Sequence, residues 1–137
     1  MVKIIYGRRG SGKTNRMITM AKDEAKNSNG HVVFVEKDNR CMLDLPHEIR
    51  YVNASEYIDK DVNIFCGFIQ GMIAANFDIV TIFIDALPSI TGLSSAAELE
   101  AFFGKILAMA EKNNVEFVLS ISGNQDDPEP FLKDYII

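Results

Sequence analysis

Short, continuously apolar runs alternate along this chain with longer stretches whose apolar residues follow a helical period. Runs rich in Val, Ile and Phe and bounded by polar residues or glycine are typical of strands buried on both faces of a parallel sheet. We therefore predict strands at residues 2–6, 31–35, 49–52, 79–84 and 115–121, with a short final strand at 135–137.

The intervening stretches repeat apolar residues every three or four positions, as an amphipathic helix does. Helices are predicted at residues 13–28, at residues 61–76 and from Ser95 onward, where Ser95 and Glu98 have the spacing of a capping box. The region from 38 to 61 is irregular, with a short helix expected at 55–59. Strand–helix alternation predicts an α/β fold, a three-layer α/β/α sandwich around a mostly parallel sheet.

The first predicted strand runs into Gly7-Arg8-Arg9-Gly10-Ser11-Gly12-Lys13-Thr14, which fits the phosphate-binding pattern G-x-x-x-x-G-K-[ST]. The glycines let the backbone N–H groups approach an anion, and the following helix start adds unpaired N–H donors. We predict that all eight residues bind a polyphosphate. Lys13 would reach the β- and γ-phosphates, and the Thr14 hydroxyl would bind Mg²⁺.

Through this motif the chain resembles the P-loop NTPase superfamily, and its order of elements resembles a minimal RecA-like ATPase core. The eight residues carry the specific part of the resemblance. It implies a nucleoside triphosphate ligand with Mg²⁺. ATP is the default nucleotide, because the chain lacks the Asn-Lys-x-Asp sequence with which GTPases read guanine.

An aspartate follows the apolar run at 79–84, and this pattern resembles the Walker B motif of the same superfamily. A carboxylate at the end of a buried strand is costly to desolvate unless a cation meets it. A Mg²⁺ ion held on Thr14, with Asp85 behind it, would meet that need. The alternative is an ordinary turn residue.

The residue after Asp85 is Ala86, where many ATPases of the superfamily have a water-activating glutamate. RecA-like proteins place a glutamate at the end of the second strand instead, and this chain has Glu36 there. Lys13 and Glu36 are therefore the predicted catalytic residues, with Glu36 as general base. The alternative for Glu36 is a solvated residue that opens a charged loop.

Polar residues also lie at the end of the run at 115–121 and just beyond it, namely Ser120, Ser122, Asn124 and Gln125. In the ATPase branch this strand lies between the first strand and the strand at 79–84, and a polar residue at its end senses the γ-phosphate. We expect Ser122 or Asn124 to do so, although the same residues make an ordinary turn. Arg8 and Arg9 would either clamp the phosphates or point to solvent or a partner.

Composition and net charge bear on the number of domains, on nucleic-acid binding and on the cellular location. With 137 residues and 47% apolar content, residues 1–137 are expected to form a single nucleotide-binding domain. The net charge of −5 gives no strong nucleic-acid signal. Two cysteines without metal-ligand spacing and no secretion leader favour a cytoplasmic protein, and the most apolar stretch carries too many polar residues for a membrane span.

The favoured hypothesis is a Mg²⁺-dependent ATPase, and the resemblance implies a homo-oligomer or a protein partner as further possibilities. A first alternative is an ATP-dependent binding module or regulator with low turnover, favoured by Ala86 and by the small size. A second is a small nucleotide or nucleoside kinase. Only the irregular segment from 38 to 61 would supply its second substrate pocket.

Overall fold

A parallel sheet of five strands forms the middle of the structure, a computed structural model that describes residues 1–124 and 126–137. The strand order is β1-β5-β4-β2-β3, and every pair is parallel. The predicted position of the strand at 115–121, between the first strand and the strand at 79–84, is confirmed. The strands are β1 (Val2–Gly7), β2 (His31–Glu36), β3 (Ile49–Asn53), β4 (Ile79–Ile84) and β5 (Glu116–Ser122).

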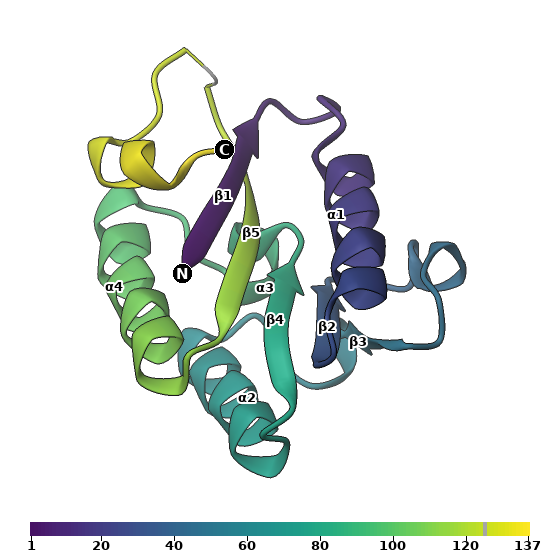
Figure 1. Cartoon of the computed structure of the whole chain (residues 1–137). Helices are drawn as coiled ribbons and strands as arrows, with labels where there is room; N and C mark the ends of the chain where they lie inside the picture. Colours follow the sequence, from purple (N-terminus) through teal and green to yellow (C-terminus); the bar gives the residue numbers. More distant parts are fainter. Residues whose placement is uncertain (125) are drawn as a thin grey trace.

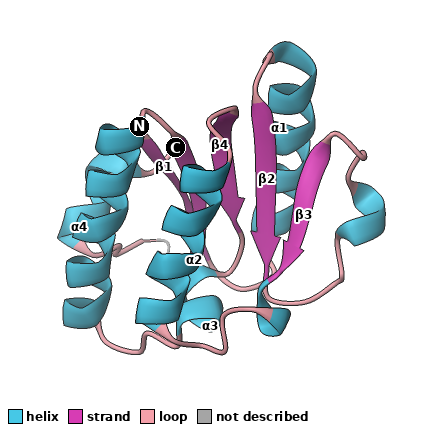
Figure 2. Ribbon diagram, turned by 90° about the horizontal axis from the view of Figure 1, so that it is seen from below, coloured by secondary structure: helices cyan, strands magenta, loops and turns pink. Residues whose placement is uncertain are grey.

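Helices cover both faces of this sheet, which confirms the predicted three-layer α/β/α architecture (Figures 1 and 2). Helix α1 (Lys13–Asn27) lies alone on one face. The other face carries α2 (Val62–Ala75), α3 (Leu87–Thr91) and α4 (Ala96–Asn113). Because all strand pairs are parallel, each connection must cross over one face and return the chain to the same end of the sheet before the next strand begins.

Local capping sets where the two long helices on the second face begin. The Asp61 carboxylate accepts hydrogen bonds from the main-chain N–H groups of Asn63 and Ile64, at 2.8 and 3.0 Å. The Ser95 hydroxyl accepts from the N–H of Glu98 at 3.1 Å, which is the serine half of the predicted capping box. These side chains satisfy helix N–H groups that have no partner within the helix.

Two features differ from the sequence predictions. Helix α3 was not predicted, since five residues are too few to show a helical period. The predicted strand at 135–137 is wrong: the chain forms a 3₁₀ helix over Pro130–Tyr135, and Ile136 then makes a single parallel bridge to Ile4. Two further 3₁₀ helices, Met42–Asp44 and Ala54–Glu56, occupy the irregular region after β2.

Aromatic side chains fill the larger half of the core, between the sheet and the α2–α4 layer. Phe65 of α2 is fully buried and meets the ring of Phe102 of α4 edge to face, with centroids 5.3 Å apart. Under α1, Met17 packs in a smaller cluster with Phe34 and Phe83. In the part of the chain that the structure describes, no helix is long and apolar enough to cross a membrane.

We expect Phe65→Ala to lower the free energy of unfolding by about 3–5 kcal/mol, because it leaves a cavity at the α2–α4 contact. Phe77→Ala is the matched control: its ring is 95% exposed, and its loss should cost less than about 0.5 kcal/mol. Urea unfolding followed by circular dichroism measures both values. Equal losses for the two variants would contradict this description of the core.

Candidate functional site

The loop between β1 and α1 is built around two left-handed glycines. Gly7 is the last residue of β1, and Lys13 is the first of α1. Gly10 and Gly12 have φ of 81° and 89°, a region that residues with a Cβ rarely adopt. The loop thus turns sharply into the helix N-terminus, where N–H groups without helical partners are available to an anion.

A cavity of about 590 Å³ lies at this loop. Its lining includes Gly12, Lys13 and Thr14 from the loop and helix start, together with Asp85, Arg40 and Ser122 from the ends of other segments. The Lys13 ammonium donates to the main-chain oxygen of Arg8 at 2.8 Å. This contact holds the lysine over its own loop, at the side of the cavity that the loop forms.

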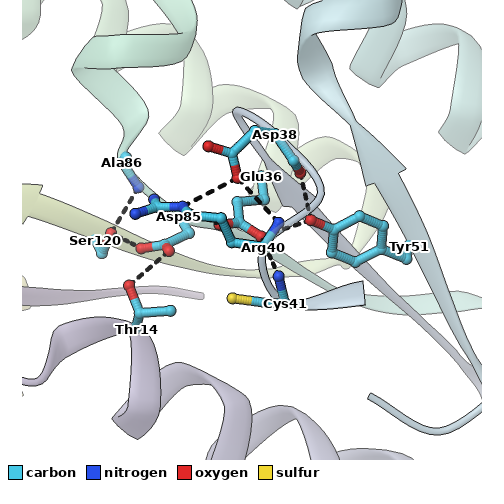
Figure 3. A network of polar contacts seen from close by, with 9 residues as sticks. All are labelled: Thr14, Glu36, Asp38, Arg40, Cys41, Tyr51, Asp85, Ala86 and Ser120. Atoms are coloured by element: carbon cyan, nitrogen blue, oxygen red, sulfur yellow. Dashed lines mark hydrogen bonds and ion pairs between the residues drawn. The ribbon is translucent and has the colours of Figure 1, made fainter. Parts of the chain in front are cut away.

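The Asp85 carboxylate connects the loop to the centre of the sheet (Figure 3). It is 2% exposed, and its two oxygens accept from Thr14 Oγ1 at 2.8 Å and from Ser120 Oγ at 2.5 Å. The main-chain N–H of Ala86 in turn donates to Ser120 Oγ at 2.7 Å. Residues from α1, β5 and the end of β4 are therefore joined through one buried carboxylate.

This donor set fits Mg²⁺. Among the described residues no Lys, Arg or His forms an ion pair with Asp85, so its buried charge is met by hydroxyl groups alone. The described residues also contain no cluster of three His, Cys, Asp or Glu side chains that would hold a metal by themselves. Mg²⁺ commonly uses one or two protein oxygens and takes its other ligands from water and phosphate.

Ala86 adopts an unusual backbone conformation directly after this carboxylate. Its φ and ψ of 56° and 50° lie in the left-handed region, which costs a residue with a Cβ about 1 kcal/mol. The turn begins α3 and aims the Ala86 N–H at Ser120. Ala86 lines the cavity, at the position where the resemblance to the P-loop superfamily would place a glutamate.

Glu36 lies at the end of β2, but its carboxylate is enclosed. It is 0% exposed; Oε2 accepts from the Cys41 N–H at 3.2 Å and from the Tyr51 hydroxyl at 2.5 Å. Oε1 has no hydrogen-bond donor in the described chain and lies 3.4 Å from Nε of Arg40. The alternative of a solvated loop residue is therefore wrong, and Glu36 is not among the residues that line the cavity.

The surroundings of Glu36 keep its neighbours protonated. Burial, followed by the nearby Glu36 charge, raises the pKa of the Tyr51 phenol. Burial, again followed by Glu36, raises the pKa of the Cys41 thiol to about 12. The hydrogen bond to Asp38 raises the pKa of Arg40. Glu36 thus sits among donors that retain their protons at neutral pH.

Of the remaining residues predicted to bind the ligand, some line the cavity and others lie away from it. Arg9 lines it, whereas Arg8 lies 3.6 Å from Asp126 in an exposed ion pair. Ser122 lines it, whereas Asn124 does not; the Asn124 side chain accepts from the N–H of Asp126 at 3.2 Å, as in a turn. Gln125 lies outside the described residues.

No protein-family model matches this chain, and no curated protein matches it at significance. Among solved structures it is similar to the flagellar accessory protein FlaH from Methanocaldococcus jannaschii, with a TM-score of 0.57 and 16% sequence identity. The match covers 98% of this chain and 66% of the FlaH chain, so this chain spans just under two thirds of that protein. The chain has a RecA-like α/β fold.

Sequence reasoning did not connect Arg40 or Tyr51 with Glu36 in this RecA-like fold. Arg40 lines the cavity, whereas Tyr51 does not. The signal for Tyr51 is positional: Phe34 is paired with Tyr51 in the β2–β3 register, which places the phenol beside the end of β2. Reading that signal requires knowing that β3 adds outside β2, a pairing that the apolar pattern alone does not predict.

A second hollow of about 480 Å³ adjoins the first at the same edge of the RecA-like sheet. Lys37 and Ser89 line both hollows. Its other polar lining residues are Asp38, Ser55, Asp59 and Lys60, all from the irregular segment. The described lining includes lysines but no arginine.

We expect Tyr51→Phe to lower the free energy of unfolding by about 1–3 kcal/mol, because the buried Glu36 carboxylate loses a donor. Tyr57→Phe removes the same atom from a residue that is 50% exposed and should change stability by less than about 0.5 kcal/mol. Denaturant titration of the two variants tests this. A Tyr51→Phe variant with an unchanged free energy of unfolding would show that the phenol does not hold Glu36.

Proposed function

We propose that this protein binds a nucleoside triphosphate with Mg²⁺, by default ATP, in the cavity at residues 7–14, and hydrolyses it. The observation that carries the proposal is the 2.8 Å hydrogen bond between Thr14 and Asp85, two residues 71 positions apart in the sequence. It brings the hydroxyl that follows a phosphate-loop lysine against a buried carboxylate. The RecA-like fold supports the same reading.

In this proposal the chain acts by positioning and electrostatics. The loop N–H groups and Lys13 would hold the β- and γ-phosphates, with Lys13 exchanging its contact to the Arg8 oxygen for a phosphate oxygen. Thr14 and Asp85 would hold Mg²⁺, which supplies positive charge against the phosphate oxygens. Ser120 keeps the Asp85 carboxylate oriented toward Thr14.

Hydrolysis requires a base that accepts one proton from water. The water oxygen would bond to the γ-phosphorus, the bond from that phosphorus to the β–γ bridging oxygen would break, and the proton would pass to Glu36. Oε1 is the candidate atom, because Oε2 already accepts two hydrogen bonds. In the present arrangement Arg40 lies against Oε1, so the carboxylate must be uncovered before it can act.

That enclosure favours a second candidate, a nucleotide-dependent binding module with low turnover. Glu36 is buried, and Ala86 offers no carboxylate at the other position where this superfamily keeps one. Both observations predict slow basal hydrolysis. The kinase alternative has less support, because the adjoining hollow offers lysines but no arginine to a second phosphorylated substrate.

Lys13→Ala should weaken binding of ATP with Mg²⁺ by at least about tenfold, because it removes a charge-assisted contact to the phosphates. The protein should stay folded, since Lys13 begins a helix at the surface. Lys22→Ala, on the same helix and exposed, is the matched control and should bind as the wild type does. Isothermal titration calorimetry with ATP and GTP measures this. Equal binding by both variants and the wild type would refute the site assignment.

Glu36→Gln should slow phosphate release by about 100-fold or more while leaving ATP affinity within about twofold, because general-base catalysis contributes at that scale. Glu48→Gln, an exposed glutamate away from the cavity, should have no effect. A phosphate-release assay alongside calorimetry separates the two candidate functions. A measurable rate that Glu36→Gln leaves unchanged would remove Glu36 from the mechanism, and a wild-type rate near zero with tight binding would favour the low-turnover module.

A further inference from the structure

Arg40 occupies a position between the phosphate cavity and the buried Glu36 (Figure 3). Its side chain is 62% exposed and lines the cavity together with Lys13 and Thr14. Its Nε lies 3.0 Å from Asp38 Oδ1 and 3.4 Å from Glu36 Oε1. The same guanidinium therefore faces the proposed ligand and holds the proposed base.

The Arg40 guanidinium has further N–H donors on its terminal nitrogens. Its hydrogen bond to Asp38 and its ion pair with Glu36 both run through Nε, and among the described residues neither terminal nitrogen makes a hydrogen bond. An arginine carries further N–H donors on those nitrogens, in a planar fork that matches two phosphate oxygens. A phosphate in the cavity would meet these donors.

The ion pair between Arg40 and its present partner, Asp38, is weak. The Asp38 side chain is 43% exposed, and exposed ion pairs contribute little because water screens them. Burial raises the pKa of Asp38, but the main-chain and guanidinium hydrogen bonds from Arg40 outweigh burial and lower it. A γ-phosphate with two or more charged oxygens would compete well for the same guanidinium.

The two oxygens of Glu36 have separate surroundings. Oε2 is anchored by the Cys41 N–H and the Tyr51 hydroxyl, neither of which lines the cavity. Oε1 is buried, receives no hydrogen bond from the described residues and lies 3.4 Å from Nε of Arg40. Moving Arg40 toward a phosphate would uncover Oε1 while Oε2 stays fixed. A carboxylate held at one oxygen and opened at the other suits a base that must accept a proton in one direction.

We propose that Arg40 is a γ-phosphate sensor that releases Glu36: a triphosphate in the cavity draws the guanidinium away from Asp38 and Glu36, and a diphosphate does not. This inference rests on the proposed function. It predicts that Arg40 contributes to the binding of triphosphates specifically. An arginine that merely stabilised the loop after β2 would affect triphosphate and diphosphate binding alike.

The test compares a non-hydrolysable ATP analogue with ADP, each titrated with Mg²⁺ by calorimetry. Arg40→Ala should weaken analogue binding by about tenfold and ADP binding by less than about twofold. Asp38→Asn should strengthen analogue binding by about threefold without changing ADP binding, because it removes the competing carboxylate and keeps the main-chain oxygen that Tyr51 contacts. Arg50→Ala, an exposed arginine on β3 outside the cavity, is the matched control. Thermal melts check that each variant is folded.

Four results overturn the inference. Equal loss of analogue and ADP binding in Arg40→Ala would assign Arg40 a structural role, and no loss of either would exclude it from the phosphate site. Weaker analogue binding in Asp38→Asn would show that Asp38 supports Arg40 rather than competing for it. If the wild type bound neither nucleotide, the proposed function and the sensor would both fail, whereas normal wild-type binding with an unchanged ratio in the variants would remove only the sensor.

Discussion

The site depends on a buried carboxylate, Asp85, with which no lysine, arginine or histidine of the described chain forms an ion pair. Asp85 is held between the Thr14 and Ser120 hydroxyls, which come from a helix start and from the neighbouring strand. A buried charge satisfied only by neutral donors is costly, and the cost is tolerable where a cation completes the surroundings. The RecA-like sheet supplies this geometry by placing β5 between β1 and β4, so that the loop, the serine and the aspartate meet at one edge.

The two carboxylates at that edge of the sheet, Asp85 and Glu36, have different surroundings. Asp85 lines the cavity and has both oxygens engaged by hydroxyl groups, which suits a fixed role. Glu36 lies behind Arg40 and has one oxygen without a donor, which suits a role that is switched. Their separation follows from the sheet order, since β2 lies beyond β4 as seen from the loop. In the proposed function, one carboxylate at the cavity and one covered carboxylate would keep nucleotide binding distinct from turnover.

Much of this arrangement was predictable because it is local in sequence. Each predicted strand from 2–6 to 115–121 lies within one residue of an observed strand, since continuous apolar runs mark buried parallel strands. The places of the loop after β1 and of Asp85 after β4 were predictable because each follows a continuous apolar run, whereas their binding of phosphate and Mg²⁺ stays a prediction. The contacts of Glu36 were not predictable, because they depend on how residues 37–48 fold back and on β3 pairing outside β2. Ser120 is recognisable in the sequence as a polar residue at the end of its strand, but its contact with Asp85 depends on the strand order.

The two edge strands of the sheet, β1 and β3, have different neighbours on their outer sides. Along β1, the Ile137 N–H donates to the Ile4 oxygen at 3.0 Å, and Arg16 donates to the Ile137 oxygen at 3.1 Å, so Ile137 is fastened to that edge strand. Along β3, the described chain places no strand on the outer side. Tyr51, whose hydroxyl donates to Glu36, therefore stands on a strand that is paired along one side only. Any shift of β3 relative to β2 would move a donor of the buried Glu36 carboxylate, so the position of that carboxylate depends on an edge strand.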